Sequence, residues 1–146
     1  MALSVPRDAE SVPVSRQVLD RCLETLGVTP DTRGDIALAL TEACANVVLH
    51  AGPGEEYAVT ASARAGKCII EVLDSGGRGG LVPRSAVPAG AMLGEHGRGL
   101  QIIDAVVDEL SLTGSSRNGT TVHFEKKLDW VPGAAGEHLL AAGEED

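Results

Sequence analysis

Apolar residues recur at helical spacing in the first third of the chain, and this pattern predicts two consecutive helices. The first helix begins at Ser11, which can cap it, continues to about Leu26, and is ended by Gly27. The second helix follows Thr29 as its cap, has Pro30 in its first position, and closes at about residues 52–54. The predicted packing face of the first helix consists of Val18, Leu19, Cys22, Leu23 and Leu26.

The second predicted helix carries two different stripes of side chains. Its apolar, core-facing stripe consists of Ile36, Leu40, Ala43 and Val47. Glu42, Asn46 and His50 recur at four-residue steps and therefore project from one side of the helix. An acid, an amide and an imidazole suit a site that holds a hydrated metal ion and activates a hydroxyl or water. A solvated helix face is the alternative explanation for these three residues.

Apolar residues at every second position, together with turn signals, predict a short edge strand and two hairpins. The predicted strands span residues 2–5, 57–63, 67–73, 110–113 and 120–128. Ala65-Gly66 and Asn118-Gly119 provide the turn signals. Between the hairpins, helical spacing begins at Leu100 and continues to about Glu109.

Asp74 ends the second strand of the first hairpin with the parity of three apolar residues, which predicts a carboxylate at the floor of a partly buried pocket. Residues 75–98 contain too many glycines and prolines for a regular element, and such a segment is a functional lid or a disordered loop. The segment from Gly94 to Leu100 leads directly into a helix, so its backbone N–H groups indicate an anion site. A flexible glycine hinge is the alternative.

Composition limits the classes of function. The net charge of −9 argues against binding of nucleic acid or an anionic membrane surface. Aromatic residues make up only 2% of the chain, so the core must be built from aliphatic side chains. We expect one domain over residues 1–128 and a flexible, acidic tail over residues 129–146. The sequence shows neither a membrane-spanning stretch nor a secretion signal, which predicts a cytoplasmic protein.

The three cysteines, Cys22, Cys44 and Cys68, are too far apart for a zinc knuckle or a redox pair. An odd number of cysteines is typical of reduced thiols in the cytosol. We expect all three to be small core residues without a catalytic role.

The order of these features resembles the ATP-binding boxes of the GHKL (HATPase_c) superfamily, shared by gyrase, Hsp90 and histidine-kinase ATPase domains. The polar helix residues come first, then Asp-x-Gly at a strand end, then a glycine-rich segment opening a helix, then a Gly-Thr-Thr strand. The chain is most similar to small anti-sigma-factor serine kinases of the RsbW and SpoIIAB type. The resemblance covers residues 3–128, and Glu-Ala-x-x-Asn-x-x-x-His at residues 42–50 is its most specific motif.

This resemblance implies an α/β (α+β) fold of the Bergerat ATP-binding type. The expected architecture is a two-layer sandwich in which three helices cover one face of a mixed, mostly antiparallel sheet. It also implies ATP and Mg²⁺ as cofactors. Asn46 would bind the magnesium, Glu42 would be the candidate base, Asp74 would accept the adenine amino group, and Gly76 would let the base approach the backbone.

The resemblance also implies which residues surround the phosphates and the rest of the pocket. These residues are Gly97, Arg98, Gly99 and Leu100 at the phosphates, and Thr120 or Thr121 from the last strand. Strand parity groups Thr120 with Val122 and Phe124, which favours Thr120 over Thr121. The chain departs from the family pattern Asp-x-Gly-x-Gly at Arg78, which takes the second glycine slot and affects the loop conformation and the nucleotide affinity.

Three functions are compatible with these features. The first is an anti-sigma factor that sequesters a sigma factor and phosphorylates a serine of an anti-anti-sigma antagonist. The second is a protein-binding module that sequesters the sigma factor without phosphotransfer. The third is the ATPase domain of a histidine-kinase-like system. All three imply protein partners, with a homodimer as a further option, and none implies direct contact with nucleic acid or membrane.

Overall fold

The computed structural model describes residues 1–6, 8–50, 56–74, 97–115 and 119–138. Over these ranges the chain forms one sheet and a layer of helices, which is the predicted α+β architecture. The elements are β1 (Ala2–Pro6), α1 (Ser11–Leu26), α2 (Pro30–His50), β2 (Glu56–Arg64), β3 (Lys67–Asp74), α3 (Gly97–Val106), β4 (Glu109–Ser115) and β5 (Gly119–Lys127). Of the irregular segment predicted at residues 75–98, residues 75–96 lie outside the described residues, as do residues 139–146. Gly97 and Arg98 already belong to α3, which begins before the predicted start at Leu100.

The sheet has the strand order β1-β2-β3-β5-β4, so β1 is an edge strand as predicted. Each pairing among the described strands is antiparallel, and the expected mixture with parallel strands is therefore not found in this part of the chain. Ala65 and Gly66, with φ values of 55° and 76°, form the predicted turn between β2 and β3. Two consecutive positive φ values are typical of the tight turns that match the twist of a hairpin.

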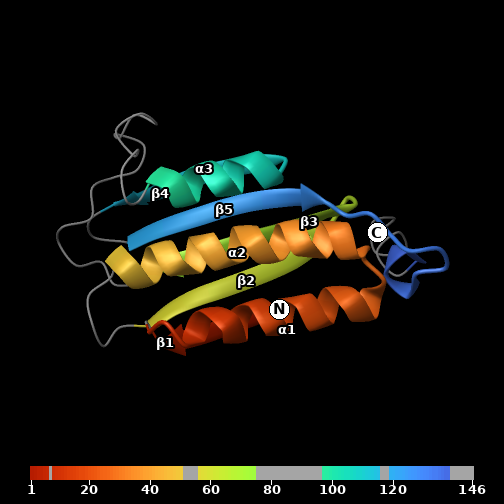
Figure 1. The fold of residues 1–146 in the computed structure, drawn as a ribbon, viewed down its shortest axis with the longest axis horizontal. Helices are drawn as coiled ribbons and strands as arrows, with labels where there is room; N and C mark the ends of the chain where they lie inside the picture. Colours follow the sequence, from red (N-terminus) through yellow and green to blue (C-terminus); the bar gives the residue numbers. More distant parts are fainter. Residues whose placement is uncertain (7, 51–55, 75–96, 116–118, 139–146) are drawn as a thin grey trace.

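The three helices α1, α2 and α3 lie on one face of the sheet, with α2 between the other two (Figure 1). Alternate residues of the central strands face this layer and form the core. The fully buried sheet residues include Val59, Ile70, Val72, Val122 and Phe124. The apolar stripe predicted for α2 is also buried, which confirms the predicted core face of that helix. The two-layer sandwich therefore follows from one apolar face on each layer.

The packing face of α1 differs from the prediction. Leu19 and Leu23 are buried as expected, but Val18 and Cys22 are exposed. The buried face instead extends toward the start of the helix through Ser11 and Ser15. The Ser11 hydroxyl forms a 2.8 Å hydrogen bond with the buried hydroxyl of Tyr57. This hydrogen bond satisfies the Ser11 hydroxyl on the buried face, and the helix is rotated so that Val18 is exposed.

Two helix ends also differ from the prediction. Ser11 is the first helical residue rather than the cap, and the Asp8 carboxylate accepts a hydrogen bond from its backbone N–H at 3.0 Å. The helix predicted to reach Glu109 ends at Val106, because Glu109 already pairs with Glu125 as part of β4. Cross-strand pairing therefore overrides the helical spacing of the last residues.

Residues 129–138, which belong to the segment predicted to be a flexible tail, contact the start of α2 and the end of α1. The Thr29 N–H donates to the Asp129 carbonyl at 2.9 Å, and the Val131 N–H donates to the Gly27 carbonyl at 2.8 Å. Trp130 packs against the core, and Ala134 is buried. The described fold thus extends past Leu128, the expected end of the domain. Among the described residues, no helix is long and apolar enough to cross a lipid bilayer.

Candidate functional site

The polar stripe of α2 lies against the first turn of α3. Asn46 on this stripe is only 8% exposed, and Glu42 is half-buried. The Glu42 Oε1 atom is 3.2 Å from the position that a Cβ on Gly99 would occupy. A side chain at residue 99 would therefore crowd the carboxylate, and glycine allows α3 to begin directly beside it. The structure thus brings Glu42 beside Gly99, and Asn46 lies one turn further along the same helix.

Leu100 has a clear structural role beside this contact. It is 7% exposed, and with the fully buried Ile103 it anchors α3 in the core. Because these two residues are three positions apart, they lie on the same side of the helix. Helix α3 begins at Gly97, two residues before the glycine that lies beside Glu42. The predicted contacts of Gly97 and Leu100 with phosphates stay predictions.

The ends of β3 and β5 bring two further candidates together. In the register of these strands Asp74 is opposite Thr120, and Leu73 is opposite Thr121. Thr121 alternates with Val122, which is buried under the helices, and so lies on the other face of the sheet. The preference for Thr120 over Thr121 as a pocket residue stays a prediction.

Several predicted residues cannot be placed in this site. Gly76 and Arg78 belong to residues 75–96 and lie outside the described residues. The side chains of His50, Asp74, Arg98 and Thr120 also lie outside the part of the chain that the structure describes. Their predicted roles rest on the sequence and on the backbone positions alone.

The available donor atoms fit a magnesium ion that arrives with phosphates. Asn46 offers an amide oxygen, and Mg²⁺ prefers oxygen ligands. Within the described ranges, no group of three or more His, Cys, Asp or Glu residues could hold a metal ion. Mg²⁺ usually keeps several waters and is held by one or two side chains plus substrate phosphates. Asn46 therefore suits a metal shared with a nucleotide better than a metal bound by protein alone.

The buried cysteines do not provide a nucleophile. Burial raises the pKa of the Cys44 thiol to about 12, and it raises the pKa of the Cys68 thiol to about 12 as well. Both are therefore protonated at neutral pH, and a thiol reacts as a nucleophile only in its thiolate form. The prediction that these two are core residues is confirmed, whereas Cys22 is exposed.

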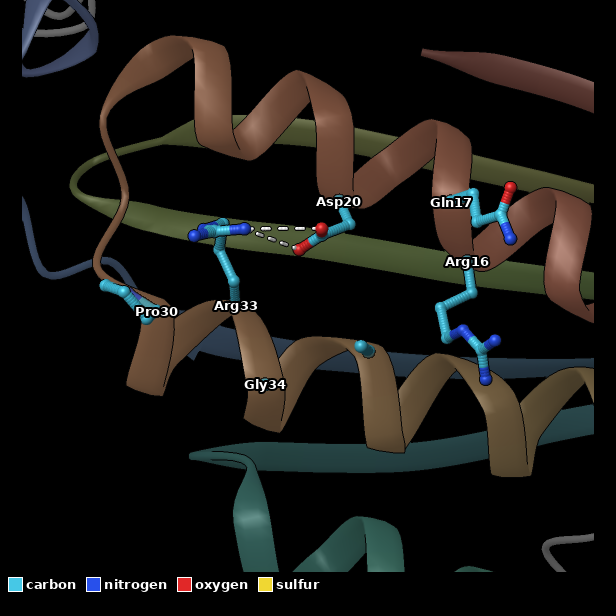
Figure 2. A pocket seen from close by; sticks show the side chains of 7 residues that line it. Arg16, Gln17, Asp20, Pro30, Arg33 and Gly34 are labelled. Atoms are coloured by element: carbon cyan, nitrogen blue, oxygen red, sulfur yellow. Dashed lines mark hydrogen bonds and ion pairs between the residues drawn. The ribbon is translucent and has the colours of Figure 1, made fainter.

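A groove that the sequence pattern did not predict lies between α1 and α2 (Figure 2). It has a volume of about 310 Å³ and is lined by Arg16, Gln17, Asp20, Pro30, Arg33, Gly34 and Ala37. Arg33 donates from one guanidinium nitrogen to both carboxylate oxygens of Asp20 at 3.2 Å, while Arg16 extends from α1 toward α2 (Figure 2). Each helix by itself has the pattern of a solvated face. The small residues Gly34 and Ala37, three positions apart on α2, were the available signal.

Comparisons with known proteins identify the family to which this fold belongs. Residues 5–126 match the family model described as histidine kinase-like ATPase domain. The chain is 28% identical over 137 residues to the serine-protein kinase RsbW of Bacillus velezensis, covering 87% of this chain and 84% of the relative. It is also 28% identical over 139 residues to the serine-protein kinase RsbW of Bacillus pumilus, covering 87% and 85%.

A solved structure has a similar fold. The histidine kinase domain of the blue-light-activated histidine kinase from Erythrobacter litoralis EL346 superposes with a TM-score of 0.51 at 25% identity. The match covers 76% of this chain and 49% of the solved chain, so this protein spans about half the length of that structure. The family match includes all of the described helices and nearly all of the sheet. This chain therefore belongs to the histidine kinase-like ATPase domain family.

Proposed function

We propose that this protein binds ATP together with Mg²⁺ and transfers the γ-phosphate to a serine of an anti-anti-sigma antagonist protein. The observation that carries this proposal is the contact of Glu42 with the first turn of α3, next to the buried Asn46. The N-terminus of a helix has positive character and favours bound phosphate. A carboxylate at that place can act on a hydroxyl group beside a phosphate. The two similar Bacillus proteins are named serine-protein kinases, which supports serine as the acceptor.

In the proposed reaction the serine oxygen attacks the γ-phosphorus, and the bond from that phosphorus to the β,γ-bridging oxygen breaks. The Glu42 carboxylate would orient the serine hydroxyl and accept its proton. The Asn46 amide oxygen would be a ligand of Mg²⁺, which when bound neutralises negative charge on the phosphates. The backbone N–H groups of the first turn of α3 would contact the phosphates, and Asp74 would accept a hydrogen bond from the adenine amino group.

The proposed biological role is the control of transcription in the cytoplasm by sequestration of a sigma factor. The partners are then a sigma factor and its antagonist, with a second copy of the chain as a further candidate. Helices α1 and α3 lie on opposite sides of α2 (Figure 1). The groove is lined by residues of α1 and α2, whereas Glu42 contacts α3. A partner bound at the groove would therefore leave the proposed nucleotide site free, and changes at Glu42 need not weaken sequestration.

Single-turnover phosphorylation of the antagonist at saturating ATP tests this proposal. Glu42→Gln keeps the shape of the side chain, and we expect it to slow transfer by about 10²-fold to 10⁴-fold with nearly unchanged nucleotide affinity. Asn46→Ala is expected to weaken Mg²⁺-dependent nucleotide binding as well as transfer. Asp104→Ala, which removes an exposed carboxylate from α3, is the control and should behave like the wild type.

The outcome also separates the alternatives. Transfer at the wild-type rate by Glu42→Gln would exclude Glu42 as the base. If the wild type binds a sigma factor and an antagonist but transfers no phosphate, sequestration without phosphotransfer is the better description. Transfer of phosphate to a histidine rather than a serine would favour the histidine-kinase-like ATPase.

A further inference from the structure

Two features bracket the packing of α3 against α2, one near each end of α3. In the first, Glu42 lies beside Gly99. In the second, Asp35 and the Val106 carbonyl are bridged by Lys126. The two contacts are seven residues apart on either helix, which corresponds to about 10.5 Å along each axis. The two helices run antiparallel, because the earlier residue on α2 lies at the end of α3 and the later one lies at its start. The distance between the two features is therefore the same along both helices.

Lys126 occupies an unusual position for a charged residue. On β5 it continues the alternation of Val122 and Phe124, which are fully buried under the helices. Its side chain is 18% exposed, and its ammonium group must therefore find partners inside the helix layer. The structure supplies two partners: the Val106 carbonyl oxygen at 2.8 Å and the Asp35 carboxylate at 3.2 Å.

Both partners fix the position of α3. Val106 is the last residue of α3, so no backbone N–H within the helix donates to its carbonyl. A cation at this end also interacts favourably with the negative end of the helix dipole. Asp35 lies seven residues before Glu42 on the same stripe of α2, so the ion pair links this end of α3 to the helix that carries the candidate base.

We infer that Lys126 is a positioning residue that sets where α3 lies along α2 and thereby sets the nucleotide affinity of the site at the other end of α3. The part of this inference that concerns nucleotide affinity rests on the proposed function. When the C-terminal end of α3 is released, the helix can shift along its axis, and its first turn then no longer lies beside Glu42 and Asn46. Backbone donors bind an anion well only when they are held in place before binding.

The test compares Lys126→Met with Lys127→Met, which removes the same charge from the neighbouring, exposed residue of β5. Lys127 uses its backbone N–H, not its side chain, in the 2.6 Å hydrogen bond to Asp108, so the control keeps that contact. Lys126→Arg retains a charged donor and serves as the rescue variant. The Kd for ATP in the presence of Mg²⁺ is measured by calorimetry at a temperature at which every variant is folded, together with hydrogen exchange of the α3 amides without nucleotide.

We expect Lys126→Met to raise the Kd about tenfold and to speed exchange in α3, with Lys126→Arg between it and the wild type. Lys127→Met should match the wild type in both measurements. An unchanged Kd for Lys126→Met, even with a lower melting temperature, would show a purely structural residue and overturn the inference.

Failure of the proposed function has a different signature. If the wild type itself binds no ATP, the nucleotide-binding proposal fails, and the exchange data decide the positioning role. Faster exchange of α3 in Lys126→Met alone would then support that role. Equal exchange in Lys126→Met and Lys127→Met would overturn it.

Discussion

His123 illustrates how a single residue links two strands on the open face of the sheet. Its Nδ1 atom lies 3.0 Å from a Glu71 carboxylate oxygen, and its Nε2 atom lies 2.8 Å from a Glu125 carboxylate oxygen. Both ring nitrogens can donate only when the imidazole is protonated. The hydrogen bonds to Glu125 and Glu71 raise the pKa of His123 above its usual value of 6.5. The hydrogen bond from His123 lowers the pKa of Glu125 below 4.5.

We predict that this cluster stabilises the protein most between pH 4.5 and pH 6.5. The contribution of His123 is fully present below 6.5, its value when unfolded, and is lost as the pH rises through its raised pKa. The contribution of Glu125 is present above 4.5 and is lost as the pH falls through its lowered pKa. Urea unfolding of the wild type and of His123→Gln should differ most within this window.

The comparison must include the other charges near the imidazole. Lys67 lies 3.8 Å from Glu125, and Glu109 also contacts Glu125. Lys67→Gln is therefore the control for the shared carboxylate and should leave the pH dependence due to His123 in place. The prediction would be contradicted if the stability difference between His123→Gln and the wild type stayed undiminished at pH values well above the raised pKa.

At the scale of elements, the corner between α1 and α2 depends on glycine at one position. Gly27 ends α1 with a φ of 94°, and its N–H donates to the carbonyls of Leu23 and Glu24. A Cβ at this residue would lie 2.5 Å from the Ala134 Cβ, which is too close for two carbon atoms that are not bonded to each other. Gly34, in the second turn of α2, has no atom within 4 Å of such a Cβ.

Two glycine substitutions should therefore change stability in opposite directions. Gly27→Ala is expected to lower the free energy of unfolding by roughly 2 kcal/mol, because it combines a strained backbone with a contact against Ala134. Gly34→Ala is expected to raise the free energy of unfolding by about 0.5 to 1 kcal/mol, because alanine favours the helix and meets open space. Chemical denaturation measures both, and a stabilised Gly27→Ala variant would refute the described corner.

At the scale of the whole molecule, residues 129–136 connect the end of the sheet to the helical layer. The Asp129 carboxylate accepts a 3.2 Å hydrogen bond from the Thr32 hydroxyl, next to the backbone bond from Thr29. Gly136 packs so closely between Leu26 and Trp130 that a Cβ there would lie 2.6 Å from both residues. This segment covers the corner that Gly27 forms.

We predict that a chain ending at Leu128 is less stable than the full chain by roughly 3 kcal/mol, from lost hydrogen bonds and the exposure of apolar surface. Trp130→Ala in the full-length chain removes only the packing and should cost less than the truncation. Urea unfolding compares the three proteins. Equal stability of the truncated and full-length chains would show that residues 1–128 form the complete folding unit.

Local pattern predicted most of the elements because their signals come from neighbouring residues. The turn at Ala65-Gly66, the start of α2 after Thr29 and the apolar stripe through Leu40 all depend on spacing within a few positions. Local pattern also placed Glu42 and Asn46 on one side of a helix. The order of the motifs was sufficient to indicate the family, although the roles of the site residues stay predictions.

The sequence by itself determined most of the helical residues, most of the strand residues, and which residues carry candidate chemistry. Only the tertiary structure decided which distant residues meet. Three contacts join separate elements: the hydrogen bond of the buried Ser11 with Tyr57, the position of Gly99 against Glu42, and the bridge from Lys126 to Asp35. The physical reason is that periodicity reports one face of one element, whereas packing and hydrogen bonding between faces depend on both partners at once.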